Sequence, residues 1–167
     1  MDINYQLNSE SNIPKFSNPE QLSDYMWDFG YSKFTTLMSP EDVLITRHGS
    51  CHDQAFLALT ELDAMGLFPK AKFIMAVDKD GVGGETHTFV YWVDNNATYW
   101  FENTWEDYQG INEFESEQEM LDCIIEAFKL RNPRQYIYLA SFDPDYHQIG
   151  EDLETFVDIC MTDAKLV

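Results

Sequence analysis

Three residues in the middle of the chain, Cys51, His87 and Glu102, have the side-chain types of a thiol catalytic triad. A cysteine attacks a carbonyl carbon as the thiolate, so its ordinary pKa of about 8.5 has to be lowered. A histidine can take the thiol proton, and a carboxylate on its second ring nitrogen fixes the tautomer and stabilises the imidazolium. These residue types predict acyl transfer through a thioester of Cys51.

Cys51 stands at the predicted start of a helix. Apolar residues recur at helical spacing from Ala55 to Met65, and Ser50 followed by Asp53 is close to a capping box. The free N–H groups and the positive dipole end of a helix N-terminus stabilise a thiolate. The alternative is that Cys51 is buried only for packing. A base near the thiol would distinguish a nucleophile from a packing residue.

The base and its partner lie on two predicted strands that a tight turn connects. A two-residue loop at Asn95-Asn96 places His87 and Glu102 on the same face of the hairpin, as diagonal neighbours. A longer loop or a bulge shifts the register by one residue and brings Asn103 to His87 instead. Glu102 is therefore the predicted third member, with Asn103 as the alternative.

The remaining patterns predict the elements that position these residues. The pairs Asn18-Pro19 and Ser39-Pro40 are typical of helix starts, and Gly66 is placed to end the helix that begins at Cys51. Strand patterns separated by short turns favour an antiparallel meander. In chain order, we expect helices at 18–29, after Pro40, at 51–65, at 116–130 and from 152, and strands at 71–77, 86–93, 98–102 and 136–142.

Four segments occur in a specific order along the chain. Gly49-Ser50-Cys51 opens a helix, Gly66-Leu67 closes it, His87-Thr88-Phe89-Val90 lies on a strand, and Tyr99-Trp100-Phe101-Glu102-Asn103-Thr104 lies on the next. This order resembles the transglutaminase-like superfamily, which has a papain-like cysteine-enzyme core, over roughly residues 40–112. The resemblance implies an α+β fold in which the helix of the nucleophile packs on an antiparallel β-sheet.

The resemblance also implies roles for individual residues. Cys51 matches the nucleophile, His87 the base and Glu102 its partner, although the family commonly has Asp at that third position. Relatives stabilise the oxyanion with the backbone N–H of the cysteine and one upstream aromatic N–H or amide, for which Trp27 and Gln21 are candidates.

Several other polar and aromatic residues near the motifs need an interpretation. His48 is a candidate substrate contact, and Trp105, beyond the strand, is a candidate groove residue. His52 projects about 100° from its neighbour on a helix, so we interpret it as flanking. Adjacent Cys51 and His52 lack the usual spacing of zinc ligands, so together with His87 they do not predict a metal site. We expect no metal and no cofactor.

Composition limits the partners and the organisation. The 167 residues are 44% hydrophobic, which favours a single domain over 1–167, with a loosely ordered arm at 1–17 and the catalytic core at 40–112. The formal charge of -20 argues against nucleic acid and anionic membrane surfaces, and it attracts basic partners. The chain shows neither a signal peptide pattern nor a long apolar run, so we expect a cytoplasmic protein.

The expected function is cysteine-dependent acyl transfer, as an amide or peptide hydrolase or as a transglutaminase-type acyltransferase. The expected substrate is a protein, a peptide or a small amide or amine, and the negative charge of the chain favours a basic one. Members of the family include hydrolases, crosslinking enzymes and inactive copies. The alternative is a non-catalytic acidic protein-binding module or effector on the same fold, because a high negative charge can dock on a basic partner without turnover.

Overall fold

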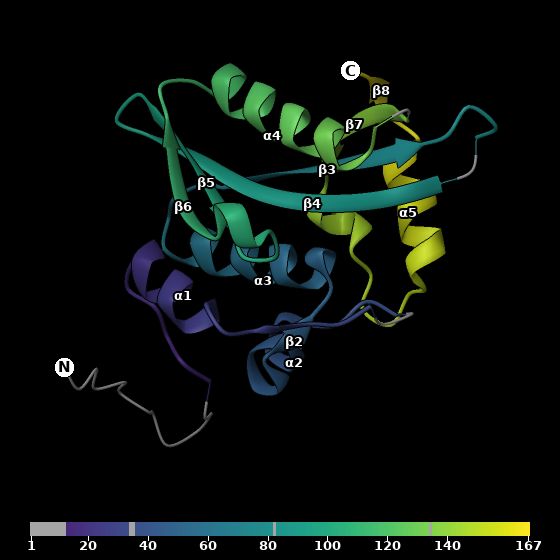
Figure 1. Ribbon diagram of the computed structural model, residues 1–167. Helices are drawn as coiled ribbons and strands as arrows, with labels where there is room; N and C mark the ends of the chain where they lie inside the picture. The colour runs from purple at the N-terminus through teal and green to yellow at the C-terminus, as the bar shows by residue number, and fades with distance from the viewer. Residues whose placement is uncertain (1–12, 34–35, 82, 134) are drawn as a thin grey trace.

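A six-stranded antiparallel sheet forms the centre of the protein (Figure 1). The computed structural model describes residues 13–33, 36–81, 83–133 and 135–167. The strands lie in the order β6-β5-β4-β3-β7-β8. Their bounds are β3 Lys70–Val77, β4 Gly83–Asp94, β5 Ala97–Glu102, β6 Gly110–Phe114, β7 Tyr136–Phe142 and β8 Lys165–Leu166. The predicted meander is thus present as β3, β4 and β5.

Helices cover both faces of this sheet, and the fold is α+β as predicted. The α-helices are α1 Pro19–Met26, α2 Pro40–Thr46, α3 Cys51–Ala64, α4 Glu117–Arg131 and α5 Leu153–Met161. Helix α4 covers one face, whereas α1, α3 and α5 lie on the other (Figure 1). A separate pair of two-residue parallel strands, β1 Gly30–Tyr31 and β2 His48–Gly49, lies beside the start of α3.

Two hydrophobic cores result, one on each face of the sheet. Strand residues alternate between the faces, so Phe89 and Tyr91 of β4 pack with α4, whereas Val90 and Trp92 pack with the helices of the opposite face. The same alternation places His87 on the α4 face. The neighbouring side chains of Thr86 and Thr88 therefore point to the opposite face, toward α3 and α5.

The first three predicted helices form where their caps indicate. Asn18 and Ser39 accept hydrogen bonds from backbone N–H groups of α1 and α2, each with proline at the first position. Gly66 follows α3 with a positive φ of 79°, a conformation that glycine adopts without strain. Helix α1 ends at Met26, three residues earlier than expected. The strands β6 and β8 were not predicted.

The predicted arm at 1–17 lies mostly outside the described residues. Of its last part, Ile13 and Phe16 pack against the core on the α3 face. Among the helices in the described parts of the chain, none has the length and apolar character that a membrane crossing needs.

Candidate active site

Local hydrogen bonds fix Cys51 at the N-terminus of α3. The Ser50 hydroxyl accepts a 3.3 Å bond from the Asp53 N–H, and the Asp53 carboxylate accepts bonds from the N–H and the hydroxyl of Ser50 at 2.9 and 2.7 Å. The predicted capping box is therefore present. The second oxygen of Asp53 accepts a 2.8 Å bond from the Met38 N–H, which ties the segment before α2 to this helix start.

The edge of β4 next to β5 provides the space for the thiol. Strand β5 pairs with β4 from Val90 to Asp94, and among the described residues no strand pairs with that edge before Val90. The first residue of α3 lies there instead. The Cys51 Sγ atom is 3.8 Å from the carbonyl oxygen of Thr86, to which the protonated thiol donates. Cys51 thus lies at the strand edge, between the two faces of the sheet.

His87 and Glu102 meet on the α4 face in a buried hydrogen bond. The Nε2 atom of His87 is 2.7 Å from Oε2 of Glu102, and both side chains are 2% exposed. The other carboxylate oxygen accepts bonds from the Thr104 N–H at 2.7 Å, the Thr104 hydroxyl at 3.0 Å and the Trp105 N–H at 3.0 Å. The chain turning away after β5 therefore wraps around the carboxylate and holds it.

The indole of Trp105 orients the His87 ring. The two rings stack with centroids 4.2 Å apart and planes inclined by 16°, and the guanidinium of Arg131 lies 4.5 Å from the outer face of the same indole. Because Glu102 engages Nε2, the Nδ1 atom of His87 is the nitrogen that remains for the Cys51 thiol. The His87 ring and the Cys51 thiol shift each other's pKa, so the interactions run from Glu102 through His87 to Cys51.

The electrostatics of these groups favour a thiolate–imidazolium pair. Burial acts to raise the pKa of Cys51, but the charge and hydrogen bonds of His52 and His87 outweigh it and lower the pKa to about 5. Burial acts to lower the pKa of His87, but Glu102 and Cys51 outweigh it and raise the pKa to about 9. Burial opposes ionisation of Glu102 as well, yet His87 and the backbone N–H groups hold its pKa below the ordinary value.

A second histidine lies on the other side of the thiol. The His52 ring is buried between Phe73 and Phe156, with Nδ1 2.5 Å from the Thr88 hydroxyl and Nε2 3.3 Å from the Thr86 hydroxyl. The sequence-based interpretation of His52 as merely flanking is therefore incomplete, because its side chain reaches the strand and lowers the pKa of the adjacent thiol.

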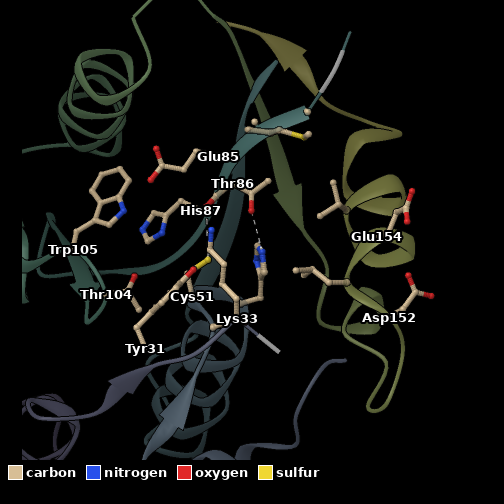
Figure 2. Close-up of a pocket in the computed structure, with 17 residues that line it drawn as sticks. Tyr31, Lys33, Cys51, Glu85, Thr86, His87, Thr104, Trp105, Asp152 and Glu154 are labelled. Atoms are coloured by element: carbon tan, nitrogen blue, oxygen red, sulfur yellow. Dashed lines mark hydrogen bonds between the residues drawn. The ribbon is translucent and has the colours of Figure 1, made fainter. Parts of the chain in front are cut away.

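Tyr31 is a site residue that the sequence reasoning missed. Pairing of Tyr31 with Gly49 places β1 beside the helix start, and the tyrosine points its hydroxyl at the sulfur of Cys51 (Figure 2). The phenol lies close enough to the side chain and the backbone of Cys51 for both to affect its pKa. Burial, together with the negative charge of a Cys51 thiolate, raises the pKa of Tyr31, so the hydroxyl keeps its proton at neutral pH.

These groups open on a cavity of about 920 Å³. Tyr31, Cys51, His87 and Trp105 line it on one side, and residues of β3 and α5 line it on the other. A peptide segment of several residues fits in this volume, next to a thiol whose pKa is lowered.

Residues 1–104 match a family model described as a transglutaminase-like domain, and this segment contains Cys51, His87 and Glu102. The chain belongs to the transglutaminase-like domain family. Among curated proteins, none matches the sequence. The match ends before α4, β7 and α5, so the cavity wall that α5 provides lies outside the matched part of this transglutaminase-like chain.

Asn103, the alternative third member, faces away from the base in this transglutaminase-like domain. Its Nδ2 atom donates to the carbonyl oxygen of Met26 at 3.0 Å and to Oε1 of Gln54 at 2.6 Å. The amide of Gln54 in turn donates to the carbonyl oxygens of Gly30 and Gly49 at 3.2 and 2.9 Å. Asn103 therefore connects α1, α3 and the β1–β2 pair rather than contacting His87.

The two candidate oxyanion donors lie away from the cavity. The indole of Trp27 is 55% exposed, and Oε1 of Gln21 accepts a 2.9 Å bond from the Ser17 N–H at the start of α1. Neither lines the cavity around the thiol. Helix α1 ends at Met26, and the short strand β1 that follows it places Tyr31 beside the thiol instead.

The two candidate contact residues have different positions. His48 is exposed on β2, where its Nδ1 atom lies 3.3 Å from the Ser32 hydroxyl and its ring covers Gly30, and it does not line the cavity. A side chain at position 30 would overlap that ring. Trp105 does line the cavity and is 8% exposed. Among the described residues, no group of three or more His, Cys, Asp or Glu side chains is arranged to hold a metal ion.

Proposed function

We propose that this transglutaminase-like protein is a cysteine-dependent acyl-transfer enzyme that acts through a thioester of Cys51. One observation carries the proposal: a buried hydrogen bond joins Glu102 to His87, and His87 interacts with the thiol at the start of α3, beside a large cavity. Structural cysteines do not need a base with an ionised partner, whereas a nucleophile does. The lowered pKa of Cys51 supports the same role.

In the first step, the Cys51 thiolate attacks the carbonyl carbon of an amide and forms the C–S bond. Negative charge develops on the carbonyl oxygen. The hydroxyl of Tyr31 lies beside the thiol and the backbone of Cys51, so we assign this hydroxyl and the Cys51 N–H to the oxyanion. As the C–N bond breaks, His87 gives its proton to the leaving nitrogen, and an amine departs.

In the second step, water or an amine attacks the thioester. Neutral His87 takes the proton of the attacking group, the C–S bond breaks, and Cys51 leaves as the thiolate. Glu102 keeps its charge through both steps and stabilises the imidazolium. Hydrolysis and transfer differ only in this acceptor, so the proposal covers a protein, peptide or small amide donor with either water or an amine as acceptor.

The net charge and the free thiols support a basic substrate and a reducing compartment for this activity. A formal charge of -20 favours basic substrates over anionic ones through long-range attraction. All three cysteines are free, which is usual where glutathione and thioredoxin keep thiols reduced, so we propose that the protein acts in the cytoplasm.

Trapping of the thioester tests the proposal. The protein is mixed with para-nitrophenyl acetate, quenched in acid and mapped by peptide mass spectrometry. We expect an acetyl group on Cys51, a burst of nitrophenol, and loss of both in Cys51→Ala. Cys123→Ala is the matched control and should keep the burst, because Cys123 lies half-buried on α4 and burial raises its pKa. Equal acetylation of all three cysteines, or a burst that survives in Cys51→Ala, contradicts the proposal.

The high negative charge favours one other function, that of a non-catalytic module that docks on a basic protein. The two functions differ in their response to Cys51→Ala, which removes the sulfur and leaves the surface charge of the ionised side chains unchanged. A biological effect that survives this substitution undiminished supports the docking module and removes the need for turnover.

A further inference from the structure

The cavity extends to two sides of Cys51. His87, Thr104 and Trp105 lie on one side, and α5 lies on the other (Figure 2). Leu153 and Val157 of α5 line the cavity, as does Met75 of β3. We call the second region the α5 lobe and define it by Met75, Leu153 and Val157. All three side chains are half-buried and pack on the core of the α3 face, so they leave apolar surface open to the cavity.

The chemistry of acyl transfer assigns a direction to the bound substrate. The leaving nitrogen receives its proton from His87, so the leaving group has to lie on the side of His87 and Trp105. The acyl group remains attached to Cys51 and extends the opposite way. In this structure the opposite way leads into the α5 lobe (Figure 2).

The acidic residues around the α5 lobe do not face it, whereas Lys33 also lines the cavity and lies beside Cys51 (Figure 2). Asp152 and Glu154 also line the cavity, but their carboxylates point away from Cys51 (Figure 2). The Asp152 carboxylate is engaged at the start of α5, where it accepts bonds from the N–H and the hydroxyl of Thr155 at 3.0 and 2.7 Å. Glu85 accepts a 3.0 Å bond from the Asn132 amide. Apart from the ammonium group of Lys33, the surface that α5 and Met75 present to an acyl group is therefore mainly aliphatic.

We propose that the α5 lobe is the acyl-group subsite and that it selects an apolar aliphatic acyl group, such as the side chain of an apolar residue that contributes the reacting carbonyl. The proposal rests on the proposed function for the direction of the substrate. It concerns α5, which lies outside the family match, so it describes a specificity that this chain supplies itself. Burial of an aliphatic chain against three aliphatic or thioether side chains favours binding by the hydrophobic effect.

A matched pair of esters tests the subsite. Para-nitrophenyl hexanoate and the mono-para-nitrophenyl ester of adipic acid have chains of the same length, but the second ends in a carboxylate. We expect the wild-type protein to have a kcat/KM about tenfold or more higher for the hexanoate, from burial of its terminal methylene and methyl groups. The rates are corrected with Cys51→Ala for turnover that does not pass through the thiol.

A charge in the lobe should reverse this preference. In Val157→Lys we expect kcat/KM to fall for the hexanoate and to rise for the adipate ester. The ratio of the two values should then lie at least tenfold below that of the wild type. Ile149→Lys is the matched control, because it makes the same change at a side chain that is 65% exposed and does not line the cavity. Leu153→Lys is the second variant if circular dichroism shows that Val157→Lys does not fold.

The outcomes separate this inference from the proposed function. Cys51-dependent turnover with equal kcat/KM for the two esters, or with a ratio that Val157→Lys and Leu153→Lys leave unchanged, overturns the subsite and leaves the thiol enzyme intact. A preference for the adipate ester that disappears in Lys33→Met also overturns it, because Lys33 then binds the acyl chain. Without any turnover, the rates at which N-hexyl iodoacetamide and its carboxylate-terminated analogue alkylate Cys51 measure the same preference, and equal rates overturn the subsite.

Discussion

The imidazole of His87 and the carboxylate of Glu102 share a 2.7 Å hydrogen bond in a region from which water is excluded. Two backbone N–H groups and one hydroxyl hold the second oxygen of the same carboxylate. The negative charge is therefore fixed in position and directed at one ring nitrogen, which leaves the other for the thiol.

The pH profile of acyl transfer should be bell-shaped. Activity needs Cys51 deprotonated and His87 protonated, so kcat/KM should rise through a pH of about 5, the pKa of Cys51, and fall through about 9, the pKa of His87. Steady-state rates across this range with a para-nitroanilide, an amide whose leaving nitrogen needs the proton of His87, provide the measurement. An acid limb near the ordinary thiol pKa would contradict the assignment of the ion pair.

Glu102→Gln should lower kcat by about a hundredfold and move the alkaline limb of that profile to lower pH. The amide keeps the shape of the side chain but removes the charge that raises the pKa of His87, and burial then favours the neutral imidazole. A pH titration of His87 by NMR checks the direction independently. An unchanged alkaline limb would show that another group holds the imidazolium.

Asn103→Ala should affect stability rather than chemistry. The substitution leaves Oε1 of Gln54 without the Asn103 donor and leaves the Met26 carbonyl with only the Phe29 N–H, which costs about 1 to 3 kcal/mol of the free energy of unfolding. Urea unfolding measures this cost, and kcat should stay within a few-fold of the wild type for the folded protein. A loss of kcat as large as that of Glu102→Gln, with His87 titrating normally, would make Asn103 the third member.

Tyr31→Phe should lower kcat by about ten- to a hundredfold with little change in KM, because the hydroxyl stabilises charge that develops only in the transition state. Trp27→Phe and Gln21→Ala are the controls, since neither side chain lines the cavity. Saturation kinetics of the three variants decide the matter. Full activity in Tyr31→Phe, or a large loss in Trp27→Phe, would remove Tyr31 from the oxyanion site.

The parts of the site that depend on local chemistry could be predicted from the sequence. Ser50 and Asp53 determine where α3 begins, because a capping box involves only residues three apart. The turn at Asn95-Asn96 determines the pairing of Asp94 with Ala97, and this register places His87 and Glu102 on one face. Both residues of the turn have positive φ, as such a turn requires.

The missed parts depend on contacts between distant segments. Tyr31 reaches Cys51 only because two strands of two residues each pair in parallel, and a segment that short has no recognisable periodicity. Helix geometry alone indicates that His52 diverges from Cys51. The prediction was incomplete because the hydroxyls of Thr86 and Thr88 on the neighbouring strand hold the ring beside the thiol. Strand β6 carries polar residues such as Asn112 and Glu113, which hide its alternation.

The most direct test of the central claim is the pH dependence of iodoacetamide labelling, with Cys51, Cys123 and Cys160 mapped separately by mass spectrometry. We predict that Cys51 reacts fastest, with its rate half-maximal near pH 5, that Cys160 stays unreactive because burial raises its pKa to about 12, and that His87→Ala moves the Cys51 midpoint to higher pH. Slow labelling of all three thiols at similar rates, with the same midpoint for Cys51 in the wild type and in His87→Ala, would contradict the account.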